Sequence, residues 1–245
     1  MSKIKTLVYC DLEATGLKNS GRPRITELSF VAVNTESILD LNAMLISNLQ
    51  KNRIKVESLF PRVVNKLTVC VYPMATILPA VSAITGLDNY NLSGQATFDT
   101  KTGELLNSFL ARLPAPLCLV AHNGDLYDFP LLKAELEKAG ITLPPDTLCA
   151  DSYVGIKEIF KIIEDSKHLK KNMDVISLGS PASYSLINLH KQLLGCSPAR
   201  SHGAEADCLT LIRTTAALGN TWVEWLQENC YHFSRCARMW SFRAL

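Results

Sequence analysis

The sequence has little net charge and no long apolar run. Its 25 basic and 23 acidic residues leave a formal net charge of +2, so a nucleic-acid surface has to be a local patch rather than a field over the whole protein. No run approaches the roughly 20 apolar residues that a membrane-spanning helix needs. We therefore expect a soluble, intracellular protein without a membrane partner, and the sequence leaves nucleus or cytoplasm undecided.

The chain also lacks linkers, repeats and paired cysteine motifs. No Gly/Ser-rich or Pro-rich stretch divides its 245 residues, of which 47% are hydrophobic, and such a chain can bury one sizeable core. We expect a single domain over residues 1–245. None of the cysteines forms a Cys-x-x-Cys pair, which argues against a zinc site even around Cys230, His232 and Cys236. Thiols scattered in apolar runs are typical of a reducing compartment.

Alternating apolar and amphipathic segments predict an α/β fold. Short runs rich in Val, Leu and Phe predict strands at 6–11, 25–34, 67–72, 117–121 and 147–150. Helical patterns occur at 105–112, 129–139, 185–194, 204–218 and 222–230, with Gly195 as a C-terminal cap. Strands that alternate with helices favour a mixed central sheet flanked by helices.

Two carboxylates stand at the end of the first predicted strand. Asp11 and Glu13 follow the apolar run 7–10, and the period of two in a strand places both side chains on one face. Neighbouring carboxylates repel each other and raise each other's pKa unless a cation neutralises them. A solvated strand end is the alternative for an isolated pair, so the pair by itself is only a candidate site for a divalent metal.

Two later segments carry further candidates. Asp128 and Pro130 follow the apolar run 117–121 and His122; proline suits a first helical turn, and an aspartate before it is either a helix cap or a further metal ligand. His202 and Asp207 stand five residues apart before another helical pattern. Alone, either of these two is compatible with an ordinary surface position.

Together these segments resemble the DEDDh family of 3′-to-5′ exonucleases. The family pattern is Asp-x-Glu, then Asp, then His-x-x-x-x-Asp, and it matches Asp11, Glu13, Asp128, His202 and Asp207. Segments 11–17, 61–68, 84–87 and 119–124 look like signatures of the three-prime repair exonuclease (TREX) group within that family. The resemblance runs from about residue 6 to residue 225. It implies a ribonuclease H-like fold and a 3′-to-5′ DNA exonuclease.

The resemblance also implies a metal-dependent mechanism. Phosphodiester hydrolysis is served by two metal ions, and carboxylates suit Mg²⁺, with Mn²⁺ as a substitute. By analogy Asp11 bridges the two metals, Glu13 and Asp207 complete the nucleophile side, and Asp128 supports the second ion. His202 is then the general base, since an imidazole with a pKa near 6.5 accepts a proton at neutral pH. His122 is expected to be a supporting or turn residue.

Recognition of a DNA end is a further implication. The family places apolar groups against the terminal bases at positions that match Leu17, Ile84 and Tyr127, and the backbone N–H groups of Ala14 and Thr15 are candidates for the 3′-hydroxyl or phosphate. Such contacts tolerate any sequence, because every base has a π-face. The alternative for Leu17, Ile84 and Tyr127 is a structural position in the core.

Two surface features complete the expectations. Lys167, Lys170 and Lys171 lie in the polar, basic segment 165–172, which is either a DNA-contacting loop or a solvated one. Members of the TREX group are homodimers that pair through a sheet edge, so a homodimer is expected here, with Arg112 near the interface. The sequence itself carries no dimer signal.

Three functions are compatible with these patterns. The first is release of mononucleotides from the 3′ ends of single-stranded, frayed or mismatched DNA. The second is the same chemistry on RNA, because a single contact to the 2′-hydroxyl can determine whether a nuclease prefers RNA or DNA. The third is a nucleic-acid-binding module without turnover, against which the intact set of four acids and one histidine argues.

Overall fold

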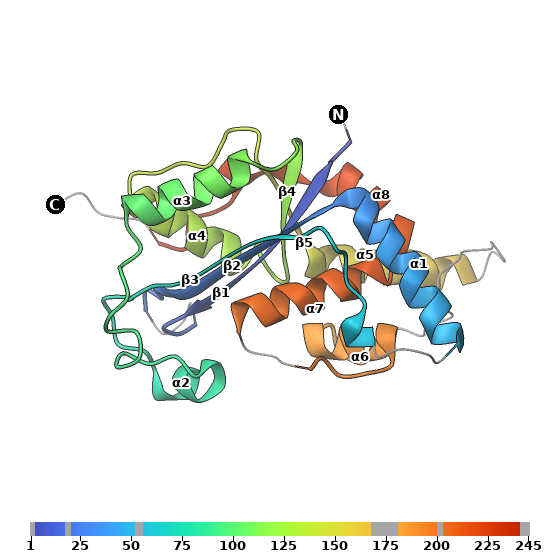
Figure 1. Ribbon diagram of the computed structural model, residues 1–245, viewed down its shortest axis with the longest axis horizontal. Coiled ribbons are helices and arrows are strands. Elements are labelled where there is room, and N and C mark those ends of the chain that lie inside the picture. Colours follow the sequence, from blue (N-terminus) through green and yellow to red (C-terminus); the bar gives the residue numbers. More distant parts are fainter. Residues whose placement is uncertain (1–2, 18–20, 52–55, 168–180, 200–202, 241–245) are drawn as a thin grey trace.

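A six-stranded mixed sheet organises the computed structural model, which describes residues 3–17, 21–51, 56–167, 181–199 and 203–240 (Figure 1). The strand order is β3-β2-β1-β4-β5-β6. Strands β1, β2 and β3 form an antiparallel meander, β4 and β5 run parallel to β1, and β6 is antiparallel to β5. The bounds are β1 (Thr6–Ala14), β2 (Ile25–Asn34), β3 (Asn65–Cys70), β4 (Leu117–Ala121), β5 (Leu148–Asp151) and β6 (Tyr231–His232). The predicted α/β class with a mixed sheet is confirmed.

Helices cover both faces of this sheet. One face packs against α3 (Thr100–Ala111), α4 (Asp128–Lys138) and the short 3₁₀ turn η3 (Phe233–Arg235). The other face carries α1 (Thr35–Lys51), α5 (Ser152–Lys167), α6 (Leu186–Leu194), α7 (Ala204–Ala216) and α8 (Gly219–Asn229), with η2 (Val56–Ser58) beside them. Helix α2 (Pro79–Thr85) stands apart from both layers and contains no buried residue (Figure 1).

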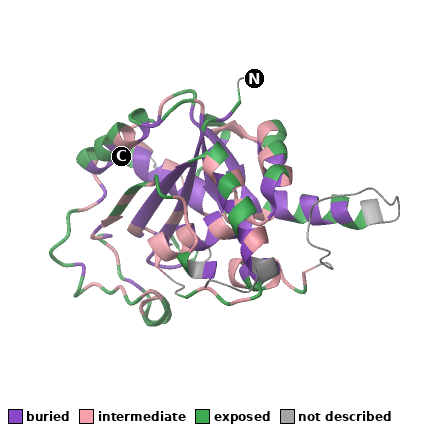
Figure 2. Cartoon of the chain, turned by 45° about the vertical axis from the view of Figure 1, so that its right-hand side comes forward, coloured by how far each residue is buried: buried purple, intermediate pink, exposed green. Residues whose placement is uncertain are grey.

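The alternation of β1 connects the core to the site. Val8, Cys10 and Leu12 face the α3/α4 layer, whereas Leu7 and Tyr9 face the α7 layer. Both sets are almost wholly buried, and Figure 2 shows the sheet as the buried centre of the molecule. Because side chains alternate along a strand, Asp11 and Glu13 lie on the same face as Leu7 and Tyr9, toward α7. They follow directly after the apolar run 7–10.

Several elements differ from the sequence prediction. Helices α1, α2 and α5 and strand β6 were not predicted, and α3 begins five residues before the predicted start because Asp99 caps it by accepting a hydrogen bond from the Thr102 N–H at 3.0 Å. Lys167 is the last residue of α5 rather than part of a loop, which corrects that assignment. Lys170 and Lys171 lie outside the described residues.

Within the described part of the chain, no helix has both the length and the apolar content needed to cross a membrane.

Candidate active site

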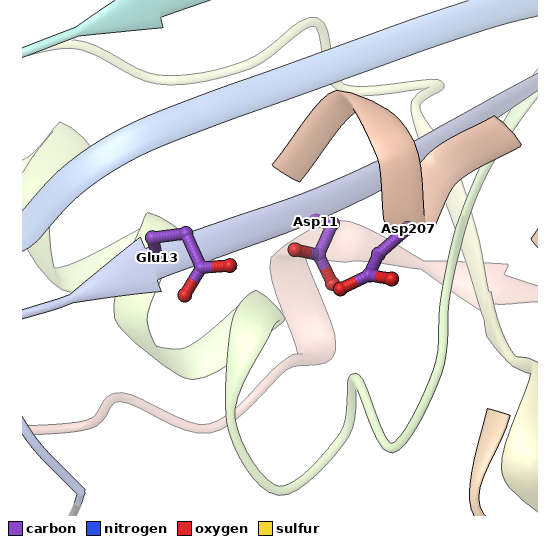
Figure 3. A group of neighbouring side chains, drawn as sticks. All are labelled: Asp11, Glu13 and Asp207. Carbon is purple, nitrogen blue, oxygen red and sulfur yellow. The ribbon is translucent and has the colours of Figure 1, made fainter. Parts of the chain in front are cut away.

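Three carboxylates lie close together at the end of β1, beside the first turn of α7. Asp11 and Glu13 come from β1 and Asp207 from the first turn of α7, and ligand oxygens of the three lie within 4.8 Å of one another. Figure 3 shows the carboxylates of Asp11 and Asp207 turned toward each other, with Glu13 beside them on the same strand. The prediction that Asp11 and Glu13 share one face is confirmed.

Asp128 approaches the same region of β1 from α4. Its side chain is buried, and its Oδ1 accepts a hydrogen bond from the Leu12 N–H at 3.1 Å. The interpretation of Asp128 as a helix cap is wrong, because Tyr127 occupies the N-cap position and α4 begins at Asp128 itself. The fold therefore attaches this carboxylate to the backbone between Asp11 and Glu13.

The acids of this cluster hold protons more tightly than ordinary carboxyls. Burial, followed by repulsion from Asp128, Asp207 and Glu13, raises the pKa of Asp11 well above its usual range. Burial and the charges of Asp207 and Glu27 raise the pKa of Glu13 to about 7. Burial raises the pKa of Asp128 to about 8, although the Leu12 N–H opposes the shift. Close oxygen ligands with uncompensated charge fit a divalent cation such as Mg²⁺ or Mn²⁺.

The metal-free protein should lose stability as the pH rises from about 5 to 8. Carboxyls titrate near pH 4 in the unfolded chain, whereas the pKa values of Glu13 and Asp128 in the folded chain are about 7 and 8. Between these limits the folded state binds more protons, so the free energy of unfolding falls with increasing pH. Saturating Mg²⁺ should restore about 3 kcal/mol at 100 times its dissociation constant.

Calorimetric melting at pH 5, 6, 7 and 8, in EDTA and in Mg²⁺, measures this linkage. Asp11→Asn is the matched control, because it removes one of the repelling charges and should make the metal-free curve shallower. A melting temperature in EDTA that rises steadily from pH 5 to 8 would contradict the electrostatic account of the cluster.

A buried aspartate shapes the turn that delivers Asp128. Asp151, at the end of β5, accepts hydrogen bonds from the N–H groups of Asn123 at 2.9 Å, Asp125 at 3.1 Å and Tyr153 at 2.8 Å. Between the first two stands Gly124, where a Cβ would lie 2.6 Å from the Cβ of Ala121. Asp151 was not predicted as a site residue, because an aspartate at the end of a short apolar strand gives no local sign of the N–H groups that the fold brings to it.

His122 supports the segment beside this turn. Its Nε2 donates to the Tyr184 carbonyl oxygen at 2.9 Å, and its Nδ1 lies 3.0 Å from Ser152 Oγ. Burial lowers the pKa of His122, so the ring is neutral at physiological pH. Both ring nitrogens are engaged in structural contacts, which confirms the expected supporting role.

The residues proposed to hold the DNA end differ in their availability. Leu17 is 73% exposed and Ile84 58% exposed, so the alternative that they are core residues is wrong. The Tyr127 hydroxyl donates to the Gly16 carbonyl oxygen at 2.5 Å, which ties this ring to the segment that carries Leu17.

The two backbone candidates for end binding also differ. The Thr15 N–H donates to the Arg24 carbonyl oxygen at 2.9 Å, so it is already paired, and this corrects the expectation for Thr15. Ala14 remains a candidate. The Thr15 carbonyl oxygen accepts from the Leu78 N–H at 3.2 Å, which links the end of β1 to the start of α2 and thus to the helix that carries Ile84.

Two remaining expectations concern His202 and Arg112. His202 lies outside the described residues. Arg112 is the exposed C-terminal cap of α3 and lines a groove together with Asn65, Lys66 and Leu67 of β3. Strand β3 is one edge of the sheet, so Arg112 lies beside a sheet edge, and its place near a dimer interface stays a prediction.

Two known proteins are similar to this chain in sequence over most of its length. No protein-family model matches the sequence. The chain is 37% identical to three-prime repair exonuclease 1 of Homo sapiens over 244 residues, which covers 98% of this chain and 72% of that protein. It is 36% identical to three prime repair exonuclease 2 of Mus musculus over 219 residues, covering 86% of this chain and 82% of that protein.

Solved structures share the fold at low sequence identity. The nuclease domain of 3′hExo, a DEDDh family member bound to rAMP, matches with a TM-score of 0.58 and 15% identity, covering 94% of this chain and 96% of that one. An E. coli ExoI complex with single-stranded DNA matches with a TM-score of 0.61 and 13% identity over 92% of this chain, which spans only 43% of that protein. The ribonuclease H-like fold of DEDDh exonucleases is therefore confirmed.

Proposed function

This chain belongs to the three-prime repair exonuclease family, and we propose that it is a metal-dependent 3′-to-5′ DNA exonuclease. Its substrates are the 3′ ends of single-stranded, frayed or mismatched DNA, from which it releases mononucleotides. The observation that carries the proposal is the meeting of Asp11, Glu13 and Asp207, with ligand oxygens within 4.8 Å of one another, next to the buried Asp128.

The acids are the proposed ligands of two Mg²⁺ ions, for which Mn²⁺ can substitute. Asp11 would contact both ions, Glu13 and Asp207 would complete the first site, and Asp128 would support the second. When bound, two such ions supply positive charge for the nonbridging and leaving oxygens of the phosphodiester. The raised pKa values of Asp11, Glu13 and Asp128 support this assignment, because a cation would release their protons and relieve their repulsion.

His202 is the proposed general base. It precedes Asp207 by five residues, the spacing of the family motif. A neutral imidazole would accept the proton of the water that attacks phosphorus, and general base catalysis contributes about 10² to 10⁴-fold to such rates. His122 is not an alternative base, because both of its ring nitrogens are engaged with Ser152 and Tyr184.

A comparison of linear DNA, linear RNA and circular DNA tests the proposal. The purified chain in Mg²⁺ should shorten a 5′-labelled single-stranded DNA from its 3′ end, one nucleotide at a time and for every sequence offered. A circular single strand should survive, because it presents no end. Cutting of the circle at the linear rate would identify an endonuclease, and faster shortening of matched RNA would identify an exoribonuclease. Binding of all three without turnover would identify a nucleic-acid-binding module.

The exposed side chains of Leu17 and Ile84 should position the terminal bases. Replacing both with Ala is expected to lower activity on single-stranded DNA, since base contacts of this kind are worth about 1 to 3 kcal/mol each. Half-maximal Mg²⁺ should change little, because neither residue is part of the acid cluster. Met44→Ala is the control, because Met44 is an exposed apolar residue of α1 that belongs neither to the acid cluster nor to the β3 edge. A double variant as active as this control would rule out a role of Leu17 and Ile84 in positioning the terminal bases.

A homodimer is part of the same proposal. Strand β3 forms one edge of the sheet, its residues Asn65, Lys66 and Thr68 are exposed, and Arg112 lies beside it. An exposed edge is a template for pairing with a second strand. Analytical ultracentrifugation should therefore give twice the mass of the chain, and a mass of one chain at micromolar concentration would contradict the dimer.

A further inference from the structure

Asp207 depends on how α7 begins. Asp11 and Glu13 share a strand, whereas Asp207 reaches them from the fourth position of a helix that starts at Ala204. The first N–H groups of a helix have no partner within the helix and are usually satisfied by a side chain at the N-cap. Here the N-cap residue is Gly203, which has no side chain to offer. Some other group has to hold this end of α7.

Glu27 supplies that group from the neighbouring strand. Its Oε2 accepts a hydrogen bond from the Ala204 N–H at 2.9 Å, across 177 residues of sequence. Glu27 lies in β2 directly opposite Glu13 in the β1–β2 register, so one strand pair carries both the acid of the cluster and the group that caps α7. A carboxylate at a helix N-terminus is also favoured by the helix dipole.

Glu27 also lies close enough to the acid cluster to act on its charges. Its charge contributes to raising the pKa of both Glu13 and Asp11, so a carboxylate here adds repulsion to a cluster that already has an excess of negative charge. Its other oxygen is 3.8 Å from the Cys70 thiol, a weak donor that offsets little of this. Of these two contacts, the hydrogen bond from the Ala204 N–H is the shorter and stronger.

We propose that Glu27 is a positioning residue of the metal site: it caps α7 from β2 and thereby holds Asp207 against Asp11 and Glu13. The proposal rests on the proposed metal-dependent function. Glu205, in the same helical turn, makes a different kind of contact, because it pairs with Lys66 at 2.7 Å on the surface, where its side chain is 40% exposed. An exposed ion pair of this kind contributes little, so Glu205 provides the matched control.

Three variants of the full chain separate capping from charge. Glu27→Ala removes the acceptor, Glu27→Gln keeps an acceptor oxygen but removes the charge, and Glu205→Gln removes a nearby surface charge. The readouts are hydrogen exchange of the Ala204 amide in the metal-free protein and Ca²⁺ affinity by calorimetry. For Glu27→Ala we expect exchange about tenfold faster or more and Ca²⁺ affinity about 10 to 100-fold weaker.

Glu27→Gln should keep most of the exchange protection of the Ala204 amide and most of the Ca²⁺ affinity. Glu205→Gln should match the wild type in both measurements. Unchanged exchange and Ca²⁺ affinity in Glu27→Ala would overturn the proposal, as would a Glu27→Gln variant that loses both as fully as Glu27→Ala does. If Glu27→Ala does not fold, exchange protection of Ala204 in Glu27→Gln decides the question. Failure of the proposed function looks different, because the wild type itself would then neither bind Ca²⁺ nor release nucleotides.

Discussion

Asp11→Asn should lower the single-turnover rate of nucleotide release by about 10³-fold or more and at the same time stabilise the metal-free protein. Metal assistance is worth several kcal/mol in the transition state, and about 4 kcal/mol corresponds to about 10³-fold. The carboxylate is repelled by Asp128, Asp207 and Glu13, so the amide relieves that repulsion. A gain of about 1 kcal/mol would raise the melting temperature by about 2 to 4 °C for a chain of this size.

Quench-flow measurements in Mg²⁺ and calorimetry in EDTA test the two halves of this prediction. The rate should fall while the stability of the metal-free protein rises. This combination is informative, because a variant that is inactive through misfolding would lose both activity and stability. Asp99→Asn is a suitable control, since Asp99 caps α3 through Thr102 and is remote from the cluster in sequence and in contacts. A rate for Asp11→Asn near that of the wild type would exclude this residue as a metal ligand.

Asp207→Asn should have the second largest effect, with a loss of activity similar to that of Asp11→Asn and a clear increase in the Mg²⁺ concentration needed for half-maximal rate. Asp207 faces Asp11 from α7 (Figure 3), whereas Glu205, two residues earlier, pairs with Lys66. The two substitutions remove one acid each from the same helical turn. Because the ion pair of Glu205 is exposed, Glu205→Gln should stay within about 0.5 kcal/mol of the wild type in stability and in the activation free energy of the reaction.

A titration of the rate against Mg²⁺ for both variants distinguishes a local from a general charge effect. If Glu205→Gln shifts the Mg²⁺ requirement as strongly as Asp207→Asn does, then negative charge near α7 matters rather than ligation by one residue. Equal activity of the two variants would remove Asp207 from the site.

Local patterns in the sequence predict much of the fold because they act over a few residues. The apolar run 7–10 predicts β1, and the period of two in a strand predicts the shared face of Asp11 and Glu13. The strands at 25–34 and 117–121 have the predicted bounds. Helix α1 was missed although Ile38, Leu41 and Leu45 recur at helical spacing and are buried. The sequence therefore does carry the signal for α1.

Other features depend on contacts between distant segments. No local pattern indicates that Glu27 caps α7 across 177 residues, or that Asp151 holds three N–H groups around the turn before Asp128. Both residues look like ordinary polar positions in their own strands. Similarly, the Thr15 N–H is unavailable only because the chain returns to place the Arg24 carbonyl oxygen beside it.

The sequence by itself determined the identities of the acids, their order and the strand periodicity that aligns two of them, because these follow from residue type and from steric rules within one element. The tertiary structure alone decided that α7 and α4 bring Asp207 and Asp128 to the same strand, and that burial together with mutual repulsion raises the pKa values of the cluster. The physical reason is distance, since Coulomb repulsion and desolvation depend on separations of a few ångströms. Only the folded chain sets those separations.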